Sequence, residues 1–366
     1  MKTIRRLIYR EAVAAVVFVA VGFIALFFFF DFVDELSNVG KAGDAYRLTQ
    51  ALAYVTLMVP SHLYELLPIA VLIGTIFVMA RLAQSSEYTI LRTSGLGPWR
   101  ALRTLLILGL MFTLFTFATG DYVAPVADRT AQLLKARLEG RISIGVTGAW
   151  LKEKQAFHTY NVNVQALTPE GDMQGVRIFE SNNRGFLVSV TKASKAHFIE
   201  GAWLLEFVER SEFDANGAAL SKVDHANLRS LRWPTEITPE MVSVALLKPD
   251  RMSTIDLFQY IQHLEANGQT SQRYEIEFWR KVFYPLSCLV MVVLALPFAY
   301  LHFRTGGITS YVFGGVLIGI SFFMLNNVFG YIGNLQNWQP WLTAAAPGLI
   351  YSMVSLAAFG WLVLRR

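Results

Sequence analysis

The chain has 366 residues, of which 54% are hydrophobic, 13% aromatic and 16% charged. Soluble proteins carry about 25% charged residues, so this composition excludes an ordinary soluble domain and indicates a membrane protein. The single cysteine, Cys288, excludes an intramolecular disulfide, and the sequence has no Cys/His cluster with the spacing of a metal site.

Six apolar segments are each long enough to cross a bilayer, since one crossing takes about 20 apolar residues. Backbone groups in lipid must pair internally, so each segment is expected to be a helix. We place the spans at residues 13–32, 57–80, 104–120, 282–301, 308–332 and 341–364. We interpret the first as a retained span, because it is long for a signal peptide and no small-residue cleavage site precedes Asp31.

Basic residues next to the spans predict the orientation, because Lys and Arg concentrate in cytoplasmic loops. They are Lys2, Arg5, Arg6 and Arg10 in the N-terminal tail, Arg81, Arg92, Arg100 and Arg103 after the second span, Arg304 after the fourth, and Arg365 and Arg366 at the end. Both termini are therefore expected in the cytoplasm. The positive charge marks topology, so we expect no nucleic-acid partner.

The polar segment between the third and fourth spans is predicted to form an exterior domain at residues 121–281. It holds 19 Lys and Arg and 20 Asp and Glu. Alternating stretches at residues 175–180, 186–198 and 203–213, bounded by turn signals, predict short strands and a sandwich or jelly roll. A helix is expected from Ser253, as its cap, to Gly268. The β core is placed at about 140–250, between transmembrane parts at 1–120 and 282–366.

No motif for nucleotide binding or hydrolysis occurs. The sequence lacks G-x-x-x-x-G-K-[ST], G-x-S-x-G, H-E-x-x-H and the Rossmann fingerprint, and its six histidines are scattered. Glu65 is the main candidate for a carboxylate within the spans, either at the rim of a cavity or in a proton relay. We therefore predict a protein that is not an enzyme. If it transports, its energy comes from another chain.

The loop of residues 81–103 could receive that energy. Ser85 or Ser86 can cap a short helix, Glu87 would lie in its first turn, and Gly95 can end it. Two interpretations stay open for this helix. It either inserts into a groove on a cytoplasmic subunit or lies along the membrane as an amphipathic helix.

Four groups of short motifs follow one another along the chain: Phe32-Val-Asp-Glu-Leu36, Arg81-Leu-Ala-Gln84 with Ser86-Glu87 and Thr93-Ser-Gly95, Val123-Ala-Pro125, and Arg273-Tyr274 with Trp279. In this order they resemble the permease subunits of the lipopolysaccharide export ABC transporter of Gram-negative bacteria, most closely the G-type permease. The resemblance covers nearly the whole chain.

The resemblance implies an α-helical membrane protein with a β insert, in which six transmembrane helices (3+3) flank a periplasmic β-jelly-roll in the bacterial inner membrane. It implies an F-type permease partner, a cytoplasmic B-type ATPase dimer, a single-pass C-type subunit and a periplasmic bridge protein. ATP-Mg would bind the ATPase, with no cofactor in this chain. The coupling helix, about 85–95, would meet the ATPase through Glu87, Tyr88, Leu91 and Arg92.

The expected substrate is lipopolysaccharide, an amphiphile with acyl chains and phosphates. Its candidate contacts are Asp34, Lys41, Lys135, Arg137, Phe28 and Phe323. The sequence departs from the family pattern where Asp31 and Gln132 replace basic residues. Gly314, Gly315 and Gly319 are expected to permit close helix contact.

Three alternatives remain open from the sequence. The chain could be the F-type sister permease, a membrane-tethered periplasmic scaffold without transport activity, or a lipoprotein-releasing ABC permease. The last has one span before its outer domain, and the three spans here argue against it.

Overall fold

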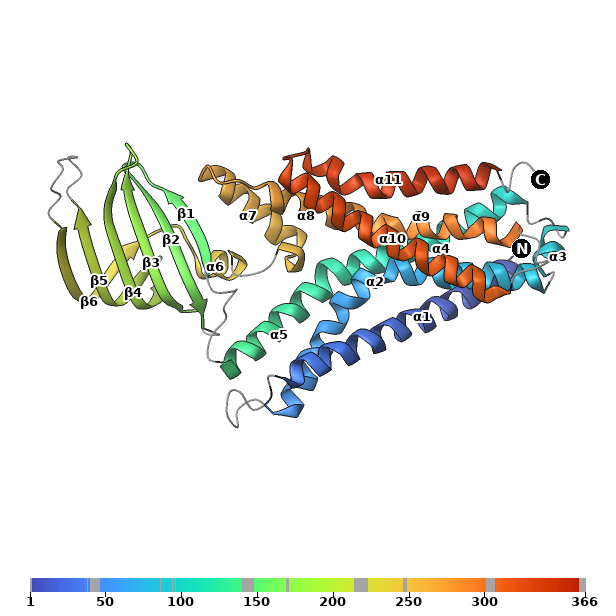
Figure 1. Ribbon diagram of the computed structural model, residues 1–366, viewed down its shortest axis with the longest axis horizontal. Helices are drawn as coiled ribbons and strands as arrows, with labels where there is room; N and C mark the ends of the chain where they lie inside the picture. Colours follow the sequence, from blue (N-terminus) through green and yellow to red (C-terminus); the bar gives the residue numbers. More distant parts are fainter. Residues whose placement is uncertain are drawn as a thin grey trace. The chain divides into compact units, whose positions relative to one another are not determined.

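The computed structural model describes residues 2–37, 39, 47–85, 87–93, 95, 97–139, 148–168, 171–213, 223–245, 249–300 and 307–361. The chain divides into two compact units (Figure 1). The helical unit comprises Met1–Glu35, Val55–Ala127 and Gln272–Arg366, and the β unit comprises Leu36–Tyr54 and Asp128–Ser271. The predicted domain boundaries at residues 120 and 281 stay predictions.

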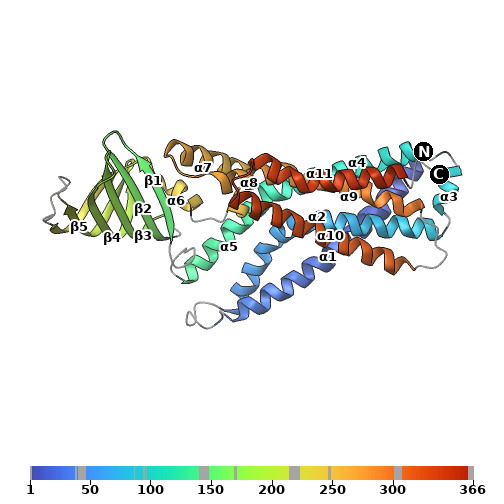
Figure 2. The same cartoon turned by 45° about the horizontal axis from the view of Figure 1, so that its top comes forward.

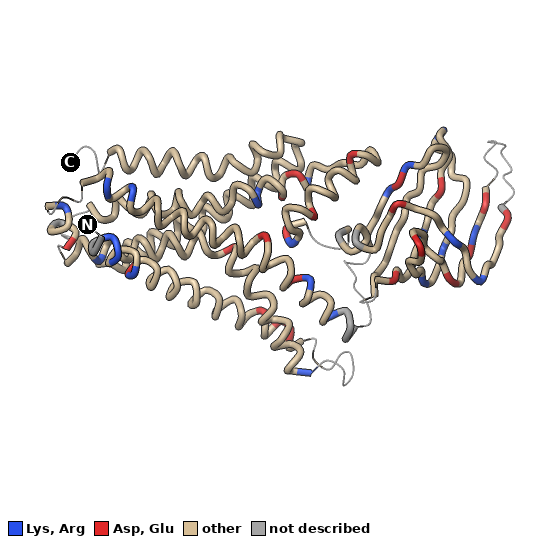
Figure 3. Tube along the Cα trace, turned by 180° about the vertical axis from the view of Figure 1, so that it is seen from behind, with Lys and Arg blue, Asp and Glu red and all other residues tan. Residues whose placement is uncertain are grey.

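Among the described residues, six helical segments are long and apolar enough to cross a membrane, which confirms the predicted number and order of spans. They are Arg5–Leu36, Leu48–Gln84, Pro98–Lys135, Gln272–Tyr300, Ile308–Leu335 and Pro340–Phe359. Their helices are α1 (Lys2–Leu36), α2 (Leu48–Gln84), α4 (Pro98–Ala118), α5 (Ala124–Glu139), α8 (Gln272–Phe283), α9 (Ser287–Ala295), α10 (Ile308–Leu335) and α11 (Pro340–Phe359), with the short α3 (Glu87–Thr93) after α2. Figure 3 shows Lys and Arg gathered at the end of the helical unit that holds the N-terminus and α3.

The third and fourth spans are interrupted. In the third, a π turn, Thr119–Val123, joins α4 to α5. In the fourth, a 3-10 turn, Tyr284–Leu286, separates α8 from α9, and a second, Leu296–Tyr300, follows α9. Each 3-10 turn contains a proline, which lacks the N–H that a regular helix needs. The π turn brings the Gly120 carbonyl to Lys281, and the second 3-10 turn ends at Tyr300, which contacts α3.

Glycines allow close contacts with α2. A Cβ at Gly74 would lie 2.7 Å from the backbone nitrogen of Val16 on α1. On α10, a Cβ at Gly315 or at Gly319 would lie 2.8 Å from an isoleucine side chain of α2. Small residues permit such close approach in membrane bundles. The prediction for Gly315 and Gly319 is therefore confirmed, whereas Gly314 has no atom within 4 Å of a built Cβ.

The β unit is built on one antiparallel sheet of six strands in chain order, with each strand paired to the next (Figure 2). The strands are β1 (Ala149–Lys154), β2 (His158–Leu167), β3 (Met173–Asn182), β4 (Leu187–Ile199), β5 (Ala202–Phe213) and β6 (Val223–Pro234). The inserted β domain is thus confirmed. In the described residues its strand order is that of a meander, because each strand pairs with the strand that follows it in the chain, and the sheet curves strongly (Figure 1).

One face of the sheet carries the core of the β unit. Register places Leu151 opposite Val162, and Val162 opposite Ile178, so these buried side chains share that face. Trp203 on β5 is fully buried, and its indole N–H donates to the carbonyl oxygen of Ile237 at 2.7 Å. The helix α6 (Pro239–Ala245) follows this point and contacts β1 and β2. The buried face is therefore closed by the chain that leaves β6.

The helix α7 (Thr254–Ala266) confirms the predicted start and end. The Ser253 hydroxyl accepts from the backbone N–H of Asp256, and the backbone N–H of Ser253 donates to the Asp256 carboxylate, which completes a capping box. Gly268 follows the helix with φ of +62°, a conformation that favours glycine. The sequence predicts an apolar stripe of Ile255, Phe258, Ile261 and Leu264 on this helix. Leu264 is buried, but the register of the stripe is wrong: the other buried residues are Leu257 and Tyr260, whereas Ile255 and Phe258 are 63% and 50% exposed.

His263 on α7 predicts a dependence of stability on pH. Burial lowers its pKa below the ordinary 6.5, and the carboxylates of Glu153 and Glu236 oppose this shift. Because the unfolded chain binds the proton more tightly, stability is intact above pH 6.5 and is lost as the pH falls through the lowered pKa of the folded chain. We expect the thermal unfolding temperature of the full chain to fall between about pH 7.5 and about pH 5.5. His263→Gln should reduce this fall; an equal fall in both proteins would contradict the prediction.

Candidate functional site

The short helix α3 lies between α2 and α4, within the predicted range of 85–95. Gly95 has φ of +99°, and its carbonyl oxygen accepts a hydrogen bond from Arg100 Nη1 at 3.0 Å. Gly95 thus ends the helix as predicted. Ser85 donates back to the carbonyl oxygens of Arg81 and Leu82, so its hydroxyl belongs to the end of α2. The alternative cap, Ser86, lies outside the described residues.

The two sides of α3 differ in their surroundings. Tyr88 is 4% exposed, and its ring meets the ring of Tyr300 edge to face at 5.2 Å between centroids. Burial raises the pKa of the Tyr88 hydroxyl well above its ordinary range. Leu91 packs against the core of the helical unit. Glu87 is exposed and Ile90 is 62% exposed. Thus Tyr88 and Leu91, two of the predicted coupling residues, pack against the rest of the helical unit. Glu87 and Ile90 lie on the exposed side of α3, which we call its free side.

The remaining predicted coupling residue, Arg92, is exposed, yet its guanidinium carbon lies 5.7 Å from the centroid of the Tyr300 ring. The helices beside α3 are tied together by polar contacts. Arg81 Nη2 lies 2.9 Å from a carboxylate oxygen of Glu11, and Tyr9 donates to the carbonyl oxygen of Thr104 at 3.1 Å. These contacts join α1 to α2 and to α4, so an ion pair and a hydrogen bond hold together the helices next to α3.

At the far end of the first span, Asp31 pairs with His62 on α2, at 2.5 Å between Oδ2 and Nε2. Phe27 contacts the His62 ring, with centroids 5.3 Å apart. Asp31, where the resemblance implies a basic residue, therefore has a partner within this chain. Asp34 is exposed, and Phe28 is half-buried and stacks on Phe32.

The other candidate substrate contacts are dispersed. In the β unit, Lys135 Nζ lies 4.9 Å from the centroid of the Tyr54 ring. In the helical unit, Phe323 is 36% exposed on α10. Lys41 and the side chain of Arg137 lie outside the described residues. The structure does not bring these residues into one pocket within either unit, and their role stays a prediction.

A buried lysine in the helical unit was missed in the sequence. Lys281 on α8 is 7% exposed, and its Nζ donates to the carbonyl oxygen of Gly120 at 2.9 Å. The same Nζ lies 5.7 Å from the centroid of the Tyr64 ring, which occupies the space beside Gly120. The π turn places this carbonyl within reach of the lysine. The signal in the sequence is Arg280-Lys281 directly before an apolar run, a pattern that by itself predicts only the edge of the fourth span.

Glu65, the carboxylate singled out from the sequence, is exposed on α2. Its backbone carbonyl accepts a hydrogen bond from the hydroxyl of Tyr284 at 2.5 Å. Arg280 donates to Glu277 at 2.9 Å and to Asn327 at 3.4 Å. Polar contacts therefore join α2 to the fourth span and α8 to α10.

Comparison with known proteins decides the family. A family profile described as "Lipopolysaccharide export system permease LptF/LptG" matches residues 6–365 of the chain. The chain belongs to the LptF/LptG permease family. The "Lipopolysaccharide export system permease protein LptG" of Escherichia coli (strain K12) is 28% identical over 339 residues, or 92% of this chain and 90% of the relative. The protein of the same name from Haemophilus influenzae is 25% identical over 370 residues, or 100% of this chain and 99% of the relative.

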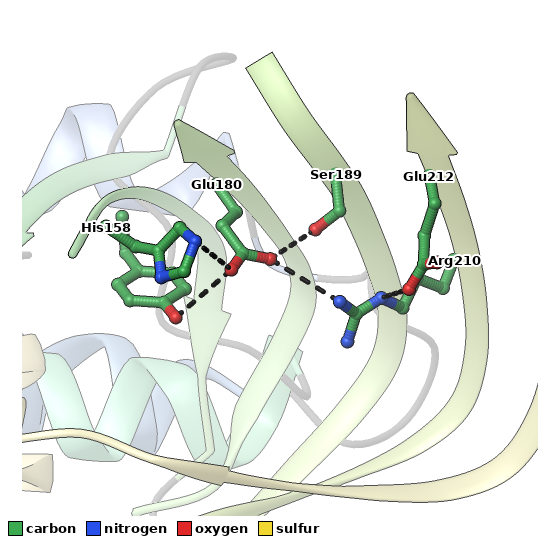
Figure 4. Close-up of polar contacts among 6 residues, drawn as sticks. His158, Glu180, Ser189, Arg210 and Glu212 are labelled. Carbon is green, nitrogen blue, oxygen red and sulfur yellow. Dashed lines mark hydrogen bonds and ion pairs between the residues drawn. The ribbon is translucent and has the colours of Figure 1, made fainter. Parts of the chain in front are cut away.

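This LptF/LptG permease also has a polar cluster at one end of its sheet (Figure 4). The Glu180 carboxylate accepts from Ser189 at 2.6 Å and from Tyr160 at 3.3 Å, and it lies 3.5 Å from Arg210 Nη2. Burial and the nearby Glu180 raise the pKa of the Tyr160 hydroxyl. The cluster joins β2, β3, β4 and β5, so it fastens the end of the sheet.

The described residues of this LptF/LptG permease contain no group of three or more His, Cys, Asp or Glu side chains that could hold a metal ion. Cys288, the single cysteine, is buried beside Thr116, with Sγ and Oγ1 3.3 Å apart.

The side chains of α3 are suited to mechanical contact, because the Glu87 carboxylate is exposed while the Tyr88 ring attaches the helix to Tyr300.

Proposed function

We propose that this chain is the G-type permease subunit of an ABC transporter that extracts lipopolysaccharide from the outer leaflet of the bacterial inner membrane. The lipid would then pass to a periplasmic bridge protein toward the outer membrane. The names of the relatives, the family profile and the six apolar helices with a β insert support this proposal. The observation that carries it is α3, a short helix with Glu87 and Ile90 on its free side.

Under this proposal α3 is the coupling helix and lies in the cytoplasm. The basic residues at this end of the helical unit support the assignment, because Lys and Arg concentrate in cytoplasmic loops (Figure 3). Both termini would lie on the same side, and the β unit would lie in the periplasm. The exposed carboxylate of Glu87 and the apolar Ile90 would contact a cytoplasmic ATPase dimer.

The energy would come from ATP-Mg bound by that B-type ATPase, because this sequence has no phosphate-binding loop. An F-type permease would complete the lipid cavity, and a single-pass C-type subunit would join the complex. Asp34, Lys41, Lys135, Arg137, Phe28 and Phe323 stay the proposed substrate contacts. An apolar and aromatic cavity with basic groups at its rim suits acyl chains and phosphates.

Glu87→Ala tests the coupling proposal. We expect association with the ATPase to weaken about tenfold or more, because the exposed carboxylate that would contact the ATPase is lost. The measurement is co-purification with the ATPase and lipopolysaccharide release from proteoliposomes that contain the complete complex. Glu209→Ala, which removes an exposed acid of the β unit, is the control.

Unchanged association and release in Glu87→Ala would contradict the coupling role. A chain that co-purifies with no ATPase would favour the tethered scaffold. The identity of the second permease in the purified complex separates the G-type from the F-type assignment.

A further inference from the structure

Tyr300 closes the fourth span at the end of its second 3-10 turn, and it is 6% exposed. Two side chains of α3 reach its ring. Tyr88 meets it edge to face at an interplanar angle of 71°, and the Arg92 guanidinium lies over it. Aromatic pairs and cation–π contacts of this kind have a preferred geometry, so the α3 helix is attached to the fourth span with a defined orientation.

This attachment crosses between the two halves of the helical unit. The chain connects α3 directly to α2 and α4, which belong to the first three spans. A helix of seven residues is too short to be stable by itself in water, so its position depends on what it packs against. Through Tyr88 and Arg92, that support comes from the fourth span.

The fourth span can pass a displacement onward. Leu296, Pro297 and Ala299 in the turn before Tyr300 are buried, and close-packed interiors transmit strain. Farther along, Tyr284 contacts Tyr64 of α2 at 5.3 Å and Phe322 of α10 at 6.3 Å between ring centroids. Phe322 in turn meets Tyr351 of α11 at 5.1 Å. One span thus connects α3 with α10 and α11.

We propose that Tyr300 is a positioning residue that receives the movement of α3 and passes it to the second half of the helical unit. This inference rests on the proposed role of α3 in coupling, and it deepens that role. The chain connections alone would carry the movement of α3 to α2 and α4, in the first three spans. With Tyr300, ATP-driven movement also enters the half that contains α10 and α11.

Two substitutions at Tyr300 test the proposal in the complete complex in proteoliposomes. Tyr300→Phe keeps the ring, so lipopolysaccharide released per ATP hydrolysed is expected within about twofold of the unaltered protein. Tyr300→Leu fills much of the space without an aromatic face, and release per ATP is expected to fall about fivefold or more. ATPase co-purification should be retained in both, because the free side of α3 is unaltered. This separation of release from association is not expected of a merely misfolded variant.

Tyr331→Leu is the matched control. Tyr331 is a tyrosine of α10 whose side chain is 69% exposed, so it lies outside the packed contacts that join Tyr300 to α10. It should release lipid normally. Unchanged release per ATP in Tyr300→Leu, or an equal loss in Tyr300→Phe, would overturn the inference. A null result for Glu87→Ala alone would instead overturn the coupling role of α3, so the two failures are distinguishable.

Discussion

Trp203→Ala is expected to lower the free energy of unfolding of the β unit by about 3–5 kcal/mol. Trp203 is fully buried, its N–H donates to the carbonyl oxygen of Ile237, and its ring lies 5.1 Å from that of Phe198 between centroids. Alanine would leave a cavity in the core of the sheet and a buried carbonyl without its donor. Both effects destabilise the folded state.

The measurement is resistance of the β unit to limited proteolysis in the detergent-solubilised full chain, over a series of temperatures. Trp150→Ala is the matched control, because Trp150 is in the same sheet but 52% exposed, and its ring stacks on the ring of Phe179. It should cost about 1 kcal/mol or less. Equal protease sensitivity of the two variants would contradict the assigned core.

Gly120→Ala is expected to destabilise the helical unit by about 1–3 kcal/mol. A Cβ at this position would lie 2.3 Å from the ring of Tyr64, a separation that real Cβ atoms essentially never show. The ring or the π turn must shift, and either movement disturbs the hydrogen bond from Lys281 to the Gly120 carbonyl. The effect would appear as a lower thermal unfolding temperature in detergent.

Gly314→Ala gives the matched control within the same unit. Nothing lies within 4 Å of a Cβ built at Gly314, so alanine should be neutral or slightly stabilising, since it is the better helix former. A lower unfolding temperature for Gly120→Ala and an unchanged or slightly higher one for Gly314→Ala are the expected results. A neutral Gly120→Ala would show that the π turn tolerates a side chain and would refute the close packing of Tyr64.

The loop of residues 81–103 shows how much of the structure the local sequence predicts. Glu87 in the first turn and Gly95 at the end were sufficient to predict a short helix, because capping and φ preferences act within a few residues. The direction of Tyr88 was not predictable in the same way. Its partner, Tyr300, is more than 200 positions away in the sequence, and only packing brings the two rings together.

The same limit applies to the charged residues of the spans. Asp31 stood out as a departure from the expected basic residue, but its pairing with His62 depends on the register of α1 against α2. Lys281 looked like a flanking residue, although it reaches a carbonyl that the π turn offers. Neither the register between two helices nor an irregular turn such as the π turn produces a periodic pattern in a single sequence.

The six spans, the polar insert with its strands, the capped α7 and the short helix after α2 were predictable from the sequence. These follow from hydropathy and from capping and turn chemistry, all of which are local. The folded arrangement was needed to establish the meander order of the sheet, the buried side of α7, the hydrogen bond from Lys281 to the Gly120 carbonyl and the attachment of α3 to Tyr300. Those features depend on contacts between distant segments, where shape and hydrogen bonding select one arrangement among many that the same pattern allows.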